Sequence, residues 1–403
     1  PLAPVGGAHV LELFRGPTSA FKDVALSILP RLISLSREKL GVKDGIAVLT
    51  ATSGDTGKAA LEGFRDVPGT RIVVFYPEDG VSDVQKAQMA TQRGGNVRVC
   101  AVRGNFDDAQ TGVKRVFLDD RANKWAAERG YRLSSANSIN LGRLAPQVAY
   151  YFKAYLDLVR AGAISLGDGV NFVVPTGNFG NILAGDFARR MGLPVEKLVC
   201  ASNENDVLTD FIRAGVYDRR RAFYKTASPS MDILVSSNLE RYLYLASGCD
   251  GALTAKLMRD LSEKGVYVAP DAVRDALKEG FWAGSAGERE AFGAIRSTWE
   301  RHGYLLDTHT AVAWAVYERF LREADNMCPT VVLATASPYK FASSVLEALG
   351  LPAADGFAAM DALLERTGVP IPKNLAEVRG LPVIHRDVCD KERILDYAKG
   401  AIA

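Results

Sequence analysis

Short apolar runs rich in β-branched residues alternate with amphipathic segments along most of the chain, and this alternation limits its fold more than any other feature. Most of the runs are apolar throughout, as in strands of a parallel sheet that helices cover on both faces. We therefore predict an α/β protein. The predicted strands are 46–50, 71–76, 97–102, 171–175, 198–202 and 330–334, and the predicted helices are 83–92, 107–129, 143–160, 182–191 and 310–322.

The chain is long enough to form two domains. Its 403 residues exceed the size at which a single core stops growing, and a Gly-rich stretch at 161–169 is typical of a boundary region. We predict a small α/β domain at 43–142 and a large domain formed by 1–42 plus 143–403. The strand rhythm stops at about 217–290, which predicts a mainly helical insertion in the large domain.

Charge and cysteine content narrow the function classes. The chain has 49 Lys and Arg against 47 Asp and Glu, a balance that gives no pull on nucleic acid or on an anionic membrane, so we expect a small-molecule partner. Five widely spaced cysteines without a C-x-x-C pair indicate neither a disulfide framework nor a metal site. We expect a cytoplasmic protein. Because the chain does not begin with Met and Lys22 lies so near its start, we also expect that an N-terminal segment was either processed away or left out of this sequence.

Three segments that follow predicted strands are suited to bind anions. In the first, the polar stretch 51–58 opens a helix, so backbone N–H groups and hydroxyls gather where the helix dipole favours negative charge. We expect a carboxylate or phosphate there. The stretch is not a nucleotide P-loop, because Thr52 and Ala59 stand where that motif requires Gly and Ser or Thr.

The other two segments have the same character. The stretch 173–181 contains Gly177 and Gly180, which let a backbone close on an oxygen-rich group, although an ordinary strand-to-helix turn is an alternative. The stretch 135–140 is followed by Arg143, whose guanidinium can grip a phosphate in a bidentate way. A polar run of this kind is also typical of a capped loop.

Lys22 lies close to the start of the chain, in the segment 16–23 with the sequence Gly-Pro-Thr-Ser-Ala-Phe-Lys-Asp. On spacing alone, a lysine beside an aspartate at a helix start is typical of the surface. The segment nevertheless resembles the one that holds the pyridoxal-phosphate lysine of threonine synthases. Five further motifs resemble that family in the same order: 51–57, Tyr76-Pro77 before a helix at Ser82, 135–140, 175–181 and 334–341. The branch resembled is that of the bacterial and fungal enzymes.

The resemblance implies a tryptophan-synthase-β-like fold, known as fold type II, with pyridoxal 5′-phosphate in the cleft between two α/β domains. It implies that Lys22 carries the cofactor as a Schiff base and is the catalytic base, and that Asp55 contacts the cofactor. The Thr335 hydroxyl would bond the pyridine nitrogen, which favours elimination and replacement chemistry over transamination. The cofactor phosphate would be held through backbone donors by Gly177, Asn178, Phe179, Gly180 and Asn181.

The implied substrate is O-phospho-L-homoserine, which becomes L-threonine with release of phosphate by γ-elimination and β-addition of water. Its two anionic groups need two sites. In the family-like pose the carboxylate would meet Thr52, Ser53 and Thr56, and the leaving phosphate would meet Asn137, Ser138 and Arg143. The branch resembled also implies a monomer.

Two alternatives stay open. One is another fold-type-II lyase, such as a threonine dehydratase or a cysteine-forming synthase, which gives no reason for a second phosphate grip. The other is a threonine-synthase-like protein that binds pyridoxal phosphate without turnover. His309 lies in a family-like segment at a helix start, where a lone histidine is more often packed or capping, and we predict that role. We expect Lys340 to be structural or electrostatic.

Overall fold

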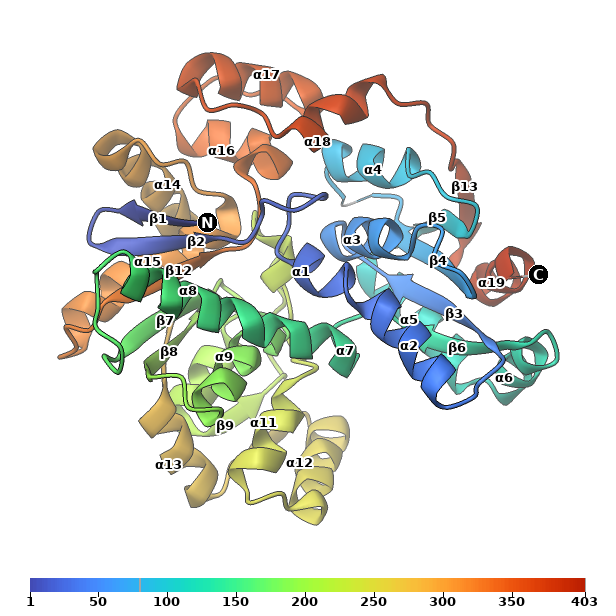
Figure 1. Ribbon diagram of the computed structural model, residues 1–403, viewed down its shortest axis with the longest axis horizontal. Coiled ribbons are helices and arrows are strands. Elements are labelled where there is room, and N and C mark those ends of the chain that lie inside the picture. The colour runs from blue at the N-terminus through green and yellow to red at the C-terminus, as the bar shows by residue number, and fades with distance from the viewer. Residues whose placement is uncertain (80, 403) are drawn as a thin grey trace. The chain divides into compact units, whose positions relative to one another are not determined.

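The computed structural model describes residues 1–79 and 81–402. Contacts within the chain divide it into two compact units, each with its own sheet (Figure 1). The first unit comprises Pro1–Leu13 and Gln147–Pro352, and the second comprises Phe14–Pro146 and Ala353–Ala403. The predicted limits, 43–142 against 1–42 plus 143–403, differ from this grouping in the segments 14–42, 143–146 and 353–403. As limits of folding domains they stay a prediction.

The second unit is built on a parallel sheet with the strand order β13-β5-β4-β3-β6. Residues of alternate parity point to opposite faces of a strand, and here both faces are apolar. Val48, Ile72 and Val74 pack under the helices between residues 22 and 90, whereas Leu49 and Val73 pack under the helices at 106–127 and 394–402. The strands are β3 Gly45–Ala51, β4 Thr70–Pro77, β5 Val97–Arg103, β6 Tyr131–Ser135 and β13 Asp387–Asp390.

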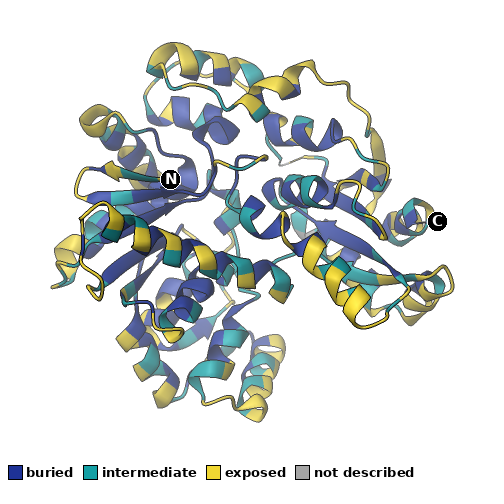
Figure 2. Ribbon diagram, in the orientation of Figure 1, coloured by how far each residue is buried: buried dark blue, intermediate teal, exposed yellow. Residues whose placement is uncertain are grey.

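In the sequence, the helices of the second unit come before, between and after these strands. Figure 2 shows their outer faces exposed and the strands beneath them buried. They are α1 Lys22–Leu26, α2 Leu29–Lys39, α3 Asp55–Phe64, α4 Asp83–Ala90, α5 Phe106–Leu118, α6 Asp120–Ala127, α7 Leu141–Leu144, α17 Gly356–Thr367, α18 Lys373–Ala376 and α19 Ile394–Ile402.

The first unit has a sheet with the strand order β1-β2-β12-β7-β8-β11. Only β1 runs antiparallel to its neighbour, and the other pairs are parallel. The helix α15 packs along four of these strands and is buried on nearly all sides of its first two turns, as a helix in the middle of a core must be. The strands are β1 Leu2–Val5, β2 Ala8–Glu12, β7 Val170–Pro175, β8 Val195–Ser202, β11 Phe281–Ser285 and β12 Thr330–Ala334.

The remaining elements of the first unit are mostly helical. A small antiparallel pair, β9 Val216–Asp218 and β10 Val266–Val268, stands apart from the main sheet. The helices are α8 Val148–Arg160, α9 Gly180–Arg190, α10 Val207–Ala214, α11 Leu239–Ala246, α12 Gly251–Lys264, α13 Asp271–Gly280, α14 Glu288–His302, α15 Thr308–Glu323 and α16 Ala342–Ala348. Across the described residues, no helix combines the length and the apolar content needed to cross a membrane.

All six predicted strands are confirmed, and the α/β class with them. The segment predicted to be helical at 107–129 is helical but is divided into two helices, because the Asp119 side chain accepts hydrogen bonds from Arg121 N (2.8 Å) and Ala122 N (3.2 Å) and starts a second helix there. The prediction of a mainly helical insertion at 217–290 leaves out the strands that this segment contains. Its last part, β11, joins the main sheet, and only Phe281 and Trp282 are large apolar residues in that strand.

Candidate active site

A fixed turn in the second unit presents Lys22 at the first position of α1. Thr18 donates to the Asp23 carboxylate from its backbone N–H (2.8 Å) and from its hydroxyl (2.5 Å). Ser19 adopts φ +59°, and a Cβ on Gly16 would collide with the Asp23 side chain. These contacts explain the local sequence, because the turn closes only around a residue without a side chain at position 16.

The Lys22 amine is buried and faces a carboxylate of the same unit. Its Nζ lies 3.5 Å from Asp55 Oδ2, and the two side chains are 9% and 3% exposed. The other Asp55 oxygen accepts a hydrogen bond of 2.6 Å from Gln85 Nε2, on α4. A surface role for Lys22 is therefore wrong, and Gln85 is a functional candidate that the sequence did not single out.

The loop between β3 and α3 carries the predicted carboxylate site. The Thr52 hydroxyl oxygen accepts hydrogen bonds from Gly54 N (2.9 Å) and Gly57 N (2.8 Å), so it caps the start of α3 and keeps its own O–H free to donate. Ser53 and Thr56 are partly exposed, and their hydroxyls bond no described residue. Thr52 thus shapes the loop, while Ser53 and Thr56 offer hydroxyl donors to a ligand.

The segment after β6 lies beside this loop. Because β6 pairs with β3 in parallel, the carboxyl ends of both strands meet at one edge of the sheet. Asn137 Nδ2 donates to Ala51 O at 2.8 Å, which ties the two loops together. Arg143 is 5% exposed, donates to Ala136 O at 2.9 Å, and has its pKa lowered to about 10 by burial. Ser138 lies in the same segment and is partly exposed.

A different anion cradle lies in the first unit, where β7 turns into α9. Phe179 has φ +59° and its ring packs 5.8 Å from Phe281, which fixes the turn. The first backbone N–H of α9 that donates a hydrogen bond is that of Leu183, which donates to Phe179 O. In the described part of the chain, the backbone N–H groups of 177–181 donate no hydrogen bond. Five consecutive donors at the start of an 11-residue helix are suited to bind a phosphate.

Hydrogen bonds from other segments of the first unit hold the side chains of this turn. Asn178 Oδ1 accepts from Ser237 Oγ at 3.0 Å, and Asn181 Oδ1 accepts from the hydroxyls of Tyr150 and Tyr151. Burial raises the pKa of both tyrosines, so they remain hydrogen-bond donors. Asn181 Nδ2 is buried without a hydrogen-bond partner among the described residues, an arrangement that leaves it available to a ligand.

Thr335 follows β12 in the same unit. It is 6% exposed, its backbone N–H donates to Thr310 Oγ1 at 3.3 Å, and its hydroxyl bonds no described residue. His309 is 3% exposed in the first turn of α15 and bonds Asp307, so its side chain is packed in the interior, as predicted, while Asp307 is the residue that caps the helix. Lys340 is 1% exposed, in the 3₁₀ turn Pro338–Phe341.

The structure thus forms two groups of predicted residues. One group lies in the second unit and consists of Lys22, Thr52, Ser53, Asp55, Thr56, Asn137, Ser138 and Arg143. The other lies in the first unit and consists of Gly177, Asn178, Phe179, Gly180, Asn181 and Thr335. The group in the second unit offers an amine together with hydroxyl, amide and guanidinium donors. The group in the first unit offers unbonded backbone donors suited to a phosphate and the Thr335 hydroxyl.

Comparison with known proteins shows which family the chain resembles. The profile of the pyridoxal-phosphate-dependent enzymes matches residues 10–337, and that of the threonine synthase C-terminal region matches residues 310–379. Human threonine synthase-like 1 is 45% identical over 359 residues, which make up 86% of this chain and 48% of that protein. The chain therefore spans about half the length of that relative.

Fungal and bacterial threonine synthases are similar over more of their length. The Saccharomyces cerevisiae enzyme is 38% identical over 362 residues, which are 85% of this chain and 69% of that protein. The crystal structure of the PLP-bound threonine synthase from Brucella melitensis superimposes with a TM-score of 0.86 at 37% identity, covering 100% of this chain and 80% of that chain. This likeness confirms the predicted fold, fold type II.

Proposed function

Because the chain belongs to the threonine synthase family of pyridoxal-phosphate-dependent enzymes, we propose that it converts O-phospho-L-homoserine and water into L-threonine and phosphate. The observation that carries the proposal is the set of five free backbone donors at 177–181, in a chain that also buries a lysine at the family's cofactor position. The names of the relatives point to the synthesis of threonine, and we propose that the residues described above bind the cofactor and the substrate.

The residues of the first unit fit pyridoxal 5′-phosphate. The N–H groups of 177–181 suit its phosphate, and the free Thr335 hydroxyl suits its pyridine nitrogen. Lys22 would bind its aldehyde carbon, with Asp55 beside it. When bound, this cofactor withdraws electrons from an attached amino acid and makes its Cα and Cβ hydrogens acidic. A neutral Thr335 beside the pyridine nitrogen would leave the ring less electron-withdrawing than an acidic partner would, which suits elimination and replacement.

The residues of the second unit fit the two anionic groups of the substrate. Ser53, Thr56 and the O–H of Thr52 would bind the carboxylate. Asn137, Ser138 and Arg143 would bind the phosphate that leaves. Because the Arg143 guanidinium is buried, water would screen its attraction to the negative phosphate only weakly. The bond from Asn137 to Ala51 supports two adjoining anion sites, as a substrate with a charge at each end needs.

Lys22 would move the protons. With cofactor and substrate bound, the Lys22 amine would take the proton from Cα and release it, take the proton from Cβ and return it at Cγ after phosphate has left, and finally return a proton to Cα. Asp55, oriented by Gln85, would keep this amine in place. Water then adds at Cβ to give the threonine hydroxyl. We also propose a monomeric, cytoplasmic enzyme; five cysteines without a disulfide are consistent with that compartment.

The experiment that tests the proposal follows both products at once. Purified protein loaded with pyridoxal phosphate is incubated with O-phosphohomoserine, and threonine and phosphate are measured over time. Equal amounts of both are expected. In a parallel incubation with threonine, release of ammonia would instead favour a dehydratase. A visible cofactor band without products in either incubation would favour a protein that binds the cofactor without turnover. The 45% identity to threonine synthase-like 1 makes the second comparison worthwhile.

A further inference from the structure

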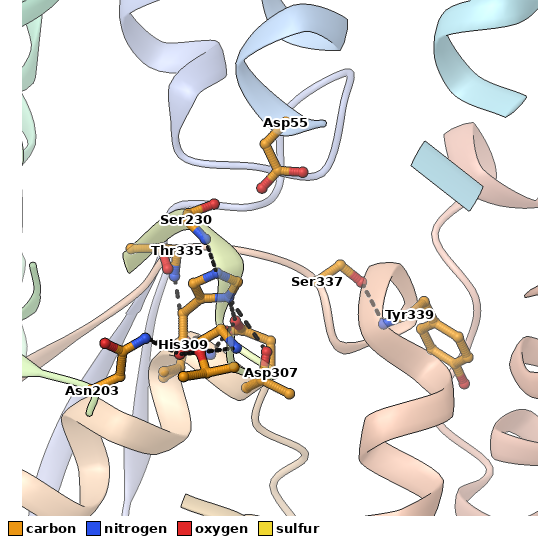
Figure 3. A network of polar contacts seen from close by, with 12 residues as sticks. Asp55, Asn203, Ser230, Asp307, His309, Thr335, Ser337 and Tyr339 are labelled. Atoms are coloured by element: carbon orange, nitrogen blue, oxygen red, sulfur yellow. Dashed lines mark hydrogen bonds and ion pairs between the residues drawn. The ribbon is translucent and has the colours of Figure 1, made fainter. Parts of the chain in front are cut away.

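One buried carboxylate in the first unit organises the residues around Thr335. Asp307 is 1% exposed and caps α15, where its side chain accepts from His309 N at 2.9 Å. It also accepts from the Thr310 hydroxyl, and the Thr310 oxygen in turn accepts from Thr335 N. Figure 3 shows Asp307, His309 and Thr335 within this network. The position of the residue assigned to the pyridine nitrogen therefore depends on Asp307.

The same carboxylate reaches a second segment through His309. The ring Nδ1 lies 3.0 Å from Asp307 Oδ1, and the ring Nε2 accepts a hydrogen bond of 3.2 Å from Ser230 N (Figure 3). In this arrangement Nε2 is the acceptor for Ser230 N, and Nδ1 is the ring nitrogen that faces the Asp307 carboxylate. The Phe341 ring, with its centroid 4.8 Å away, packs against the imidazole.

Ser230 belongs to the segment that lies against the phosphate cradle. A Cβ added to Gly177 would stand 3.0 Å from Ser230 O and 3.1 Å from Met231 Cα, so the two backbones are in close contact there. The next residue, Asp232, anchors this segment by accepting from Asn203 Nδ2 (2.7 Å) and Thr226 N (2.9 Å). His309 thus fixes the part of the segment that touches Gly177.

We propose that His309, oriented by Asp307, is a positioning residue that sets the distance from the phosphate cradle at 177–181 to Thr335. Asp307 holds Thr335 through Thr310, and it holds the backbone against Gly177 through His309 and Ser230. A cofactor that uses both places needs them at a fixed spacing, and a single carboxylate provides it. The inference rests on the proposed binding of pyridoxal phosphate by this chain.

The test compares three variants with the native chain. His309→Phe keeps the ring that packs on Phe341 but loses the bonds to Ser230 and Asp307. His309→Gln restores an acceptor near Ser230 N. His302→Phe makes the same change at an exposed histidine on α14 and is the matched control. The dissociation constant of pyridoxal phosphate is measured from the visible band, the environment of its phosphate by ³¹P NMR, and the melting temperature without cofactor.

We expect His309→Phe to bind the cofactor about tenfold to a hundredfold more weakly, since one hydrogen bond is lost and a buried carboxylate loses a donor. Its ³¹P resonance should shift, His309→Gln should recover most of the affinity, and His302→Phe should match the native chain. A lower melting temperature with unchanged affinity would overturn the inference. So would equal weakening in the Phe and Gln variants. If the native chain itself showed no cofactor band, the proposed function would fail and the inference with it.

Discussion

The Lys22 amine and the Asp55 carboxylate form a buried pair in the second unit, 3.5 Å apart. Gln85 holds the second carboxylate oxygen at 2.6 Å, so the pair has one orientation. Buried charged pairs are costly and are typical of sites where the charges take part in chemistry. Removing either partner leaves the charge of the other buried without compensation. At the scale of single residues, this pair and Arg143 are the positions where a substitution says most about function.

Replacing Lys22 with Ala should abolish the visible band of the lysine-bound cofactor and slow threonine formation by about a thousandfold or more, because both the covalent anchor and the proton carrier are lost. Absorbance spectra and the threonine assay measure the two effects separately. The exposed Lys39, at the end of α2, gives the matched control Lys39→Ala. A Lys22→Ala protein with native turnover would remove Lys22 from the mechanism.

Replacing Arg143 with Gln should lower kcat/KM for O-phosphohomoserine about tenfold to a hundredfold, the effect of losing a charged hydrogen bond to phosphate. Cofactor loading should stay native. The exposed Arg132 on β6 gives the control Arg132→Gln. Because burial lowers the pKa of Arg143 to about 10, its charge is present at neutral pH and is lost as pH rises through that value. Inhibition of the native enzyme by inorganic phosphate should therefore weaken above about pH 10.

At the scale of elements, the turn from β7 into α9 combines close backbone packing with unbonded donors. Replacing Gly177 with Ala would place a methyl group 3.0 Å from Ser230 O, so the backbone must shift. We expect cofactor affinity to fall about tenfold and stability to fall by about 1–3 kcal/mol, the usual effect of overpacking. Gly293, exposed on α14 with open space around it, is the contrast, and Gly293→Ala should stabilise the protein by about 0.5–1 kcal/mol. Denaturant unfolding and cofactor titration measure both.

The elements that sequence predicted and those that it missed differ in their local signals. The strands β3, β4, β5, β7, β8 and β12 carry continuous β-branched runs and were predicted. β11 was missed, because Gly284 and Ser285 follow only two large apolar residues and its pairing with β8 is a long-range contact. β13 was also missed, since three of its four residues are exposed at the sheet edge.

The site residues also divide into those with a local sequence signal, which were predicted, and those without one, which were missed. The cradle at 177–181 was predicted because its glycines follow a strand, and sequence alone left an ordinary turn as an alternative. Gln85 and Asp307 were not singled out for function, because each acts through a partner that the fold supplies: Asp55, from another helix, for Gln85, and Thr335, through Thr310, for Asp307. Contacts between residues far apart in sequence leave no spacing pattern to recognise.

At the scale of the whole molecule, the residues assigned to the cofactor come from both units, with Lys22 and Asp55 in the second and 177–181 and Thr335 in the first. A ligand that binds only the folded chain adds RT ln(1 + [L]/Kd) to the free energy of unfolding, about 2.7 kcal/mol at a hundredfold excess over Kd. If one cofactor uses both sets of residues, this stabilisation should extend to the elements of both units.

Hydrogen exchange followed by mass spectrometry measures this unit by unit. Pyridoxal phosphate should slow exchange in the peptides that cover 177–181 and also in those that cover α1 and the start of α3, because unfolding of either unit then requires release of the ligand. In Lys22→Ala the protection of 177–181 should persist in part, since the phosphate still has its backbone donors, while that of α1 should disappear. Protection confined to the first unit of the native chain would contradict the assignment of Lys22 and Asp55 to the cofactor.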